Sequence, residues 1–284
     1  SNTFWRLGGN AGTTPGTHFL GTADGQPLEF KVNGIRALRL ENSGDSAIDI
    51  GSTPDGAPNV IGGSPANFVG AGVVGATIAG GGATNYGGLP YTNSVLANFG
   101  VVGGGIGNTI AADSRSATLA GGELNAIGTN ADGSAIGGGA LNSIAANCAS
   151  ATIAGGTHND IGTDSGYSAI GGGHYNNIAA NSRWATIAGG YYNNIVANSW
   201  WATIAGGLYN GIGTNCDFSA IGGGWSNNIL ANSAYATIPG GRLNAATNDA
   251  FAAGRRAHAL HTGSFVWADS TEADFTSTAS NQFN

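Results

Sequence analysis

Charged side chains are scarce in this sequence of 284 residues, where Asp, Glu, Lys and Arg together make up 9%. Lys and Arg number 9 against 16 Asp and Glu, so the formal net charge is −7. Proteins that bind nucleic acid neutralise phosphates with clustered basic side chains. We therefore expect no nucleic-acid partner.

Long apolar runs are also missing. No stretch approaches the roughly 20 consecutive apolar residues of a membrane-spanning helix, and we expect no membrane insertion. Glycine, by contrast, is abundant at 52 residues, and the hydrophobic content is 41%. Glycine costs about 1 kcal/mol against alanine inside a helix, while this much apolar surface needs a core. The composition predicts an ordered all-β protein.

A repeat of 17 residues runs along most of the chain. Its third position holds an apolar residue in nine consecutive units: Val102, Leu119, Ile136, Ile153, Ile170, Ile187, Ile204, Ile221 and Ile238. Ile61 and Ile78 are earlier markers, and a seven-residue insertion around "TNYGGLPYT" lengthens the next step. The repeat predicts eleven rungs.

Each unit contains two short apolar segments, such as "ATIA" and "YNNIV", separated by Gly-Gly and followed by a loop. Such units cannot bury their own apolar faces, so they stack as a solenoid. Seventeen is not a multiple of six, which excludes a hexapeptide helix and favours a flattened two-sheet parallel β-roll. We expect an N-terminal β cap at 1–56, the solenoid at 57–246 and a C-terminal cap or neck at 247–284.

An asparagine recurs at the ninth position of nine successive units. Two positions later most units have Ile, so strand periodicity points the Asn inward. Identical buried amides stacked at strand spacing satisfy one another as a ladder. The predicted ladder is Asn108, Asn125, Asn142, Asn159, Asn176, Asn193, Asn210, Asn227 and Asn244.

A second polar column lies five residues further on and alternates between Asn and Asp, which favours turn capping. Its carboxylates are never on adjacent rungs, and His258 and His261 have no cysteine nearby. We expect no metal and no cofactor. Cys148 and Cys216 occupy the same slot four repeats apart, roughly 19 Å at about 4.8 Å per rung, which is too far for a disulfide.

Several segments resemble known fibre proteins. The stacked "SAIGGG" and "ATIAGG" strands with an inner Asn resemble the left-handed parallel β-roll heads of trimeric autotransporter adhesins, although the adhesin repeat is shorter. Residues 9–40, "GNAGTTPGTHFLGTADGQPLEFKVNGIRALRL", resemble the segment that precedes repeats in bacteriophage tail-fibre-like proteins. Residues 250–270, "AFAAGRRAHALHTGSFVWADS", resemble the segment that follows them. The resemblance implies a left-handed homotrimeric fibre segment.

Aromatic residues gather at the least repetitive positions of the C-terminal units. Two interpretations are open: the rings pack within one chain or between the chains of a trimer, or they form a ligand-binding surface for a cell-surface glycan or receptor. The candidate residues are Tyr167, Trp184, Trp201, Phe218 and Tyr235, with Trp200 beside them.

No recurring carboxylate pair suits glycoside hydrolysis. We therefore expect a non-enzymatic fibre or adhesin segment that spaces and presents a receptor-binding surface, extracellular on a bacterial surface or phage particle. The small, uncharged outer face of the first strand favours close packing with a partner chain, as in a homotrimer. The alternative is a polysaccharide depolymerase of the tailspike type.

Overall fold

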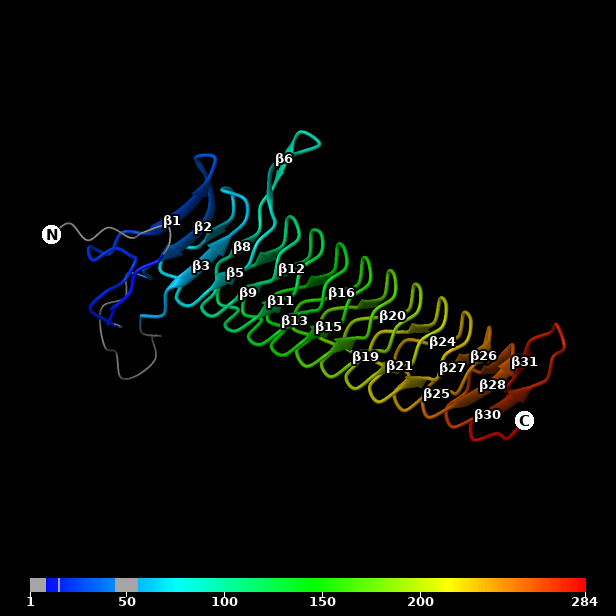
Figure 1. Cartoon of the computed structure of the whole chain (residues 1–284). Helices are drawn as coiled ribbons and strands as arrows, with labels where there is room; N and C mark the ends of the chain where they lie inside the picture. The colour runs from blue at the N-terminus through cyan, green and yellow to red at the C-terminus, as the bar shows by residue number, and fades with distance from the viewer. Residues whose placement is uncertain (1–8, 15, 44–55) are drawn as a thin grey trace.

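The computed structural model describes residues 9–14, 16–43 and 56–284, which form a long solenoid of two parallel sheets (Figure 1). Each turn contributes one short strand to each sheet, and equivalent residues of successive turns pair in register. The described residues contain no helix, and hence none that could cross a membrane. The predicted fold class, an all-β parallel solenoid with 17-residue repeats, is confirmed.

The first sheet holds 16 strands. It begins with the antiparallel strands β1 (Leu28–Val32) and β2 (Ile35–Glu41), and β2 pairs with β3 (Asn59–Gly62). The strands that follow are β5 (Thr77–Ile78), β9 (Val101–Val102), β11 (Thr118–Leu119), β13 (Ala135–Ile136), β15 (Thr152–Ile153), β17 (Ala169–Ile170), β19 (Thr186–Ile187), β21 (Thr203–Ile204), β23 (Ala220–Ile221), β25 (Thr237–Ile238), β26 (Gly241–Arg242), β28 (Phe251–Arg255) and β30 (Phe265–Ala268).

The second sheet holds 13 strands. They are β4 (Phe68–Val69), β8 (Ser94–Val95), β10 (Thr109–Ile110), β12 (Ala126–Ile127), β14 (Ser143–Ile144), β16 (Asp160–Ile161), β18 (Asn177–Ile178), β20 (Asn194–Ile195), β22 (Gly211–Ile212), β24 (Asn228–Ile229), β27 (Ala245–Ala246), β29 (Ala257–Ala259) and β31 (Phe275–Thr276).

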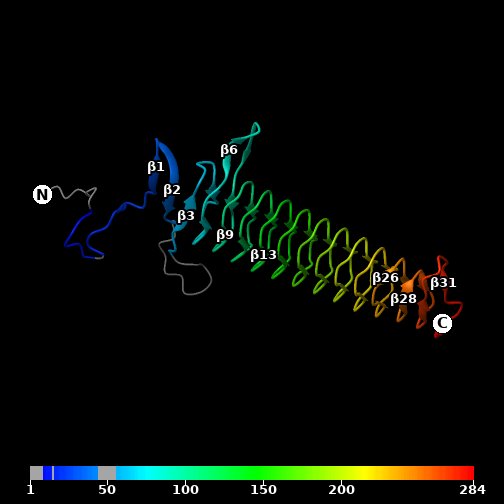
Figure 2. The same ribbon diagram turned by 45° about the vertical axis from the view of Figure 1, so that its right-hand side comes forward.

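The predicted insertion forms a hairpin of its own. Strands β6 (Ala83–Tyr86) and β7 (Leu89–Tyr91) pair antiparallel with each other. The hairpin projects from the side of the solenoid in both views (Figures 1 and 2). An insertion at a turn leaves the stacking of the two sheets undisturbed.

The solenoid has about 13 turns, two more than the eleven markers predict. Strands β28 and β30 continue the first sheet in shorter steps, since Ala252 pairs with Val266. The segment 247–284, expected as a cap or neck, therefore contributes strands β28 to β31 to the same two sheets. Within the expected N-terminal cap, residues 1–8, 15 and 44–55 lie outside the described residues.

The core between the sheets contains one isoleucine from each strand in the regular turns. Ile187 of β19 and Ile195 of β20, for example, are both fully buried. Because identical side chains stack in register, every turn buries apolar surface with the same packing. The core is therefore a continuous rod along the solenoid.

The nine ladder asparagines are also buried, at 0–1% exposure. The Oδ1 of Asn176 accepts the backbone N–H of Asn193 at 3.1 Å. Its Nδ2 lies within hydrogen-bond distance of the carbonyl oxygens of Gly172 and Gly190, both at 2.9 Å. Each side chain thus links its own turn to the turns before and after it, which fixes the stacking register.

The chain reverses at two edges in every turn. At the first edge, where it passes from the first sheet to the second, a Cβ on Gly156 would collide with the carbonyl oxygen of Gly173, so only glycine fits. At the second edge, where it returns to the first sheet, two residues per turn have φ near +60°, for example Asn181 and Trp184. Both edges carry side chains that face solvent.

Candidate functional site

Five rings stack on the second edge, one per turn. We call them the aromatic column: Tyr167, Trp184, Trp201, Phe218 and Tyr235. Centroids of successive rings are 5.6, 4.8, 4.8 and 5.3 Å apart, and the planes differ by 2–7°. The rings remain 38–61% exposed. The column is therefore ordered by its own stacking and borders solvent along its length.

Each column residue adopts a left-handed backbone conformation, with φ between 55° and 61°. This conformation directs the backbone N–H to the turn before, as the bond from Trp201 N to Arg183 O (3.0 Å) illustrates. The same backbone position is Ser116, Gly133 or Ser150 in the three turns immediately before the column, with φ between 57° and 64°, and Phe99 one turn earlier, with φ 57°. The turn therefore needs the conformation but not an aromatic side chain.

The parallel planes determine what the column presents. Stacked rings cover one another's faces, so the column offers ring edges to solvent along most of its length. Trp200 is different: its plane lies at 69° to both Trp184 and Trp201. It is 40% exposed. Trp200 is thus the one of the six predicted site residues that stands across the stack.

A groove of about 500 Å³ surrounds Trp200. Its other lining residues are Asn181, Arg183, Asn198, Asn215 and Asp217.

Hydrogen bonds hold Trp200 in the groove. The Nε1–H donates to the carbonyl oxygen of Asn181 at 2.8 Å, which ties the indole to the preceding turn. The Oδ1 of Asp217 accepts the backbone N–H of Trp200 at 2.7 Å. Both ends of the residue are therefore anchored, and the ring orientation follows from the fold.

The groove offers polar groups of both signs. Arg183 and Asp217 form no ion pair with any other residue of the described chain, although Arg183 Nε donates to Asp164 O at 3.3 Å. The Asn215 amide donates to Asn232 Oδ1 at 2.9 Å. The remaining donors and acceptors are free for a ligand.

A second set of rings occupies the first edge, opposite the aromatic column. His158, Tyr175, Tyr192 and Tyr209 follow one another at centroid distances of 4.5, 4.7 and 5.4 Å. Burial and the neighbouring tyrosines raise the pKa of Tyr192. No hollow comparable to the Trp200 groove accompanies these rings among the better-formed hollows of the described chain.

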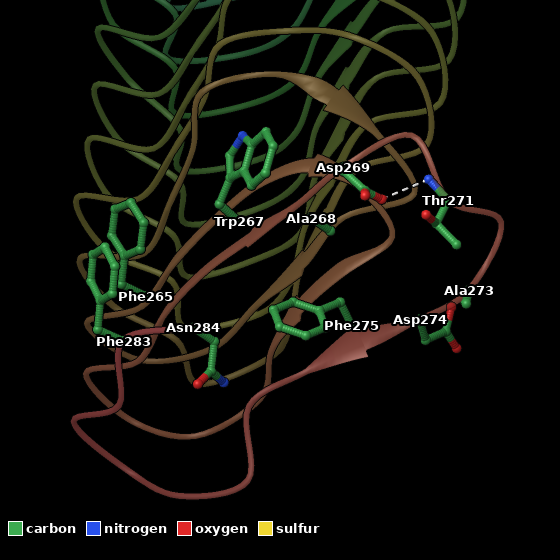
Figure 3. A pocket seen from close by; sticks show the side chains of 10 residues that line it. All are labelled: Phe265, Trp267, Ala268, Asp269, Thr271, Ala273, Asp274, Phe275, Phe283 and Asn284. Carbon is green, nitrogen blue, oxygen red and sulfur yellow. Dashed lines mark hydrogen bonds between the residues drawn. The ribbon is translucent and has the colours of Figure 1, made fainter.

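A larger hollow, about 720 Å³, lies at the C-terminal end of the solenoid (Figure 3). Its lining is mainly apolar and includes Phe265 and Phe283, which stack at 4.6 Å. The two carboxylates there are already engaged: Asp269 accepts the N–H of Thr271 at 2.8 Å, and Asp274 pairs with Arg256. Among the described residues its lining includes no cationic side chain, whereas the Trp200 groove has Arg183.

Metal ligands do not gather anywhere in the described chain, where no three His, Cys, Asp or Glu side chains form such a group. Cys148 and Cys216 are free and fully buried, as their shared slot predicts. Burial raises the pKa of both thiols, which disfavours the reactive thiolate. The cysteines have a packing role.

Comparison with known protein families and with curated proteins finds no match for this chain. The candidate site therefore depends on its own geometry. Sequence reasoning placed Trp200 beside the column but did not single out Arg183 or Asp217 as its partners. Their spacing of 17 residues on either side of Trp200 is the signal that could have identified them.

Proposed function

We propose that this chain is a non-enzymatic segment of a fibre or adhesin that spaces and presents a receptor-binding surface. That surface is the aromatic edge, which comprises the aromatic column and Trp200. The observation that carries the proposal is that exposed rings occupy left-handed backbone positions in five consecutive turns, where the three turns immediately before them have Ser or Gly.

The backbone cost makes this observation informative. A side chain in the left-handed region costs about 1–2 kcal/mol relative to the right-handed one, and bulky residues are uncommon there. Stacking between neighbouring rings offsets part of that cost, at about 0.5–1.5 kcal/mol per pair. Because Ser and Gly build the same turn, the fold does not require an aromatic side chain at this position. We attribute the exposed rings to contact with a ligand.

The regular stacking suits a spacer. Every regular turn repeats the same backbone and ladder bonds, so the solenoid holds the aromatic edge at a fixed place along a rigid rod. Glycoside hydrolysis by a tailspike-type depolymerase would need a facing pair of carboxyl groups. Asp132 and Asp217 instead accept backbone N–H groups of the preceding turn, at 2.7 Å each. This supports a binding role over an enzymatic one.

A homotrimer with left-handed winding is part of the proposal, as is an extracellular location on a bacterial surface or phage particle. The outer face of the first sheet supports close packing of chains. It carries small uncharged side chains such as Thr152, Ala169 and Thr186, which are partly or fully exposed. Such a face lets a neighbouring chain approach closely.

Light scattering on the purified protein tests the assembly and should give about three times the 28.0 kDa chain mass. Binding to a panel of immobilised glycans and host cells tests the surface. Changing Trp184, Trp200 and Trp201 together to Ala should abolish binding and spare the trimer. A wild-type protein that is monomeric at micromolar concentration contradicts the fibre assignment, and unchanged binding by the triple variant contradicts the aromatic edge.

A further inference from the structure

We infer that the Trp200 groove binds one pyranose ring of a neutral oligosaccharide, with the indole as the platform and the flanking polar groups as hydroxyl partners. The inference rests on the proposed function of the aromatic edge and narrows it to one residue and one ligand class. In this inference the rings of the aromatic column hold Trp200 in place and do not contact the sugar.

The orientation of each ring decides whether it can contact the sugar or only support Trp200. A sugar ring stacks its apolar C–H face on an exposed aromatic face, as any flat apolar group does. In the middle of the column both faces of a ring are covered by its neighbours, as Trp201 shows between Trp184 and Phe218, each at 4.8 Å. Trp200 stands at 69° to these rings and lines the groove. Among the rings in the middle of the aromatic edge, it is the one whose face a sugar can cover.

The platform is fixed before any ligand arrives. The Nε1–H bond to Asn181 O and the edge contacts with Trp184 and Trp201 together define the plane of the indole. A side chain held in its bound orientation loses little conformational entropy on binding. In this way the column rings contribute to binding as the support of Trp200 and not as its surface.

The polar groups of the groove suit hydroxyl groups. Trp200 lies between the positive Arg183 and the negative Asp217, one turn away on either side. The side-chain amides of Asn181 and Asn198 form no hydrogen bond with another side chain in the described chain and supply both donors and acceptors. A hydroxyl group both donates and accepts, so a sugar ring on Trp200 can engage several of these groups.

Charge selects against an acidic ligand. The groove contains one group of each sign, and the chain as a whole has a formal charge of −7. A glycan rich in carboxylate or sulfate groups would gain one contact with Arg183 and lose by repulsion from Asp217 and the surrounding field. A neutral sugar meets no such penalty.

The test is a glycan array that contains neutral linear hexose oligosaccharides and uronic-acid oligosaccharides of matched length, followed by calorimetric titration of the tightest neutral binder. Trp200→Ala should weaken that titration about tenfold or more, and Trp200→Phe should recover part of the loss. Arg183→Ala should weaken it severalfold.

Trp225→Ala is the matched control, since Trp225 lies on the first edge with a similar exposure of 42%. Arg115→Ala controls for loss of an arginine at the same position of an earlier turn.

The melting temperature of each variant shows whether it is folded. Titrations at low and high salt should agree within about twofold, because counter-ion screening acts on charged ligands. Selective binding of uronic-acid oligosaccharides, or a steep loss of affinity with salt, overturns the neutral ligand class. If folded Trp200→Ala binds like wild type while Trp184→Ala with Trp201→Ala does not, the groove is overturned and the aromatic edge stands. Absence of binding to every glycan and host cell overturns the proposed function itself.

Discussion

Two hollows on the second edge of the solenoid share equivalent loop positions but have different side chains. The earlier one, about 560 Å³, includes Arg115 and Asp132 in its lining and no aromatic ring. The later one, about 500 Å³, has Trp200 between Arg183 and Asp217. Asp132 and Asp217 accept the same kind of backbone bond from the preceding turn, at 2.7 Å. The fold therefore supplies the groove in both regions, and the side chains decide what it can bind.

The comparison extends to whole turns. Turns with Ser116, Gly133 and Ser150 at the second edge and turns with the aromatic column share the ladder, a buried aliphatic core and similar φ values. Because the shared features are buried and the differing ones are exposed, stability and binding are properties of separate sets of residues. The predictions below test this separation.

The largest effect is expected where the two regions are the same. Asn125→Leu in an early turn and Asn176→Leu in an aromatic turn should each lower the free energy of unfolding by about 3 kcal/mol. In each case the next ladder N–H and a glycine carbonyl lose their amide partner, at about 1–3 kcal/mol per buried group. Chemical denaturation measures both. A loss confined to the aromatic turn would show that the two regions do not share one framework.

A smaller effect should reveal what the left-handed backbone costs. Gly133 has φ +64° at the position that Trp184 and Trp201 occupy in later turns. An added Cβ meets only Ser150 Oγ, at 3.8 Å, so Gly133→Ala introduces no clash. We expect it to destabilise by about 1 kcal/mol, from the backbone conformation alone. Thermal unfolding measures this effect. An unchanged melting temperature would show that the left-handed backbone costs nothing at this position, which would contradict the reason given for functional rings.

The smallest effect concerns Asp160, which pairs with Ser143 of an early turn and Asn177 of an aromatic one. Burial raises the pKa of its carboxyl group, so ionisation disfavours the folded state: the stability contributed by the protonated form is lost as the pH rises through that pKa. Asp160→Asn should therefore slightly raise the melting temperature at neutral pH, and the gain should shrink below the ordinary pKa of Asp.

The exposed Asp113→Asn is the control for this pH dependence. Asp113 stands at a turn position where most later turns have Asn. If both variants respond to pH alike, burial of Asp160 is not the cause.

Much of the fold could be predicted from the spacing of single residue types. Isoleucine every 17 residues predicted the stacked strands, and the coincident asparagine column predicted buried amides. The last two turns were not counted as turns because they drop to 14-residue steps, where Ala252 and Val266 replace isoleucine. A repeat search depends on constant length, whereas strand pairing depends only on the backbone meeting the turn before.

The site was less predictable. The six aromatic residues were visible in the sequence as a column, but their ring planes depend on rotamers that neighbouring turns determine. In the sequence, Arg183 and Asp217 are isolated charges in loops, and no recurring pattern marks them as a site. Stacking brings them to either side of Trp200 and leaves them without ion pairs in the described chain.

The sequence by itself determined the solenoid, because a strict period repeats the same burial requirement in every turn and only stacking satisfies it. It also determined which side chains lie at the edges, since these are the positions that vary without disturbing the period. Only the tertiary structure decided how the rings face. Five stack on one another, and Trp200 turns across them because its indole N–H reaches the Asn181 carbonyl of the turn before. That bond joins residues 19 apart, so it exists only once successive turns are stacked.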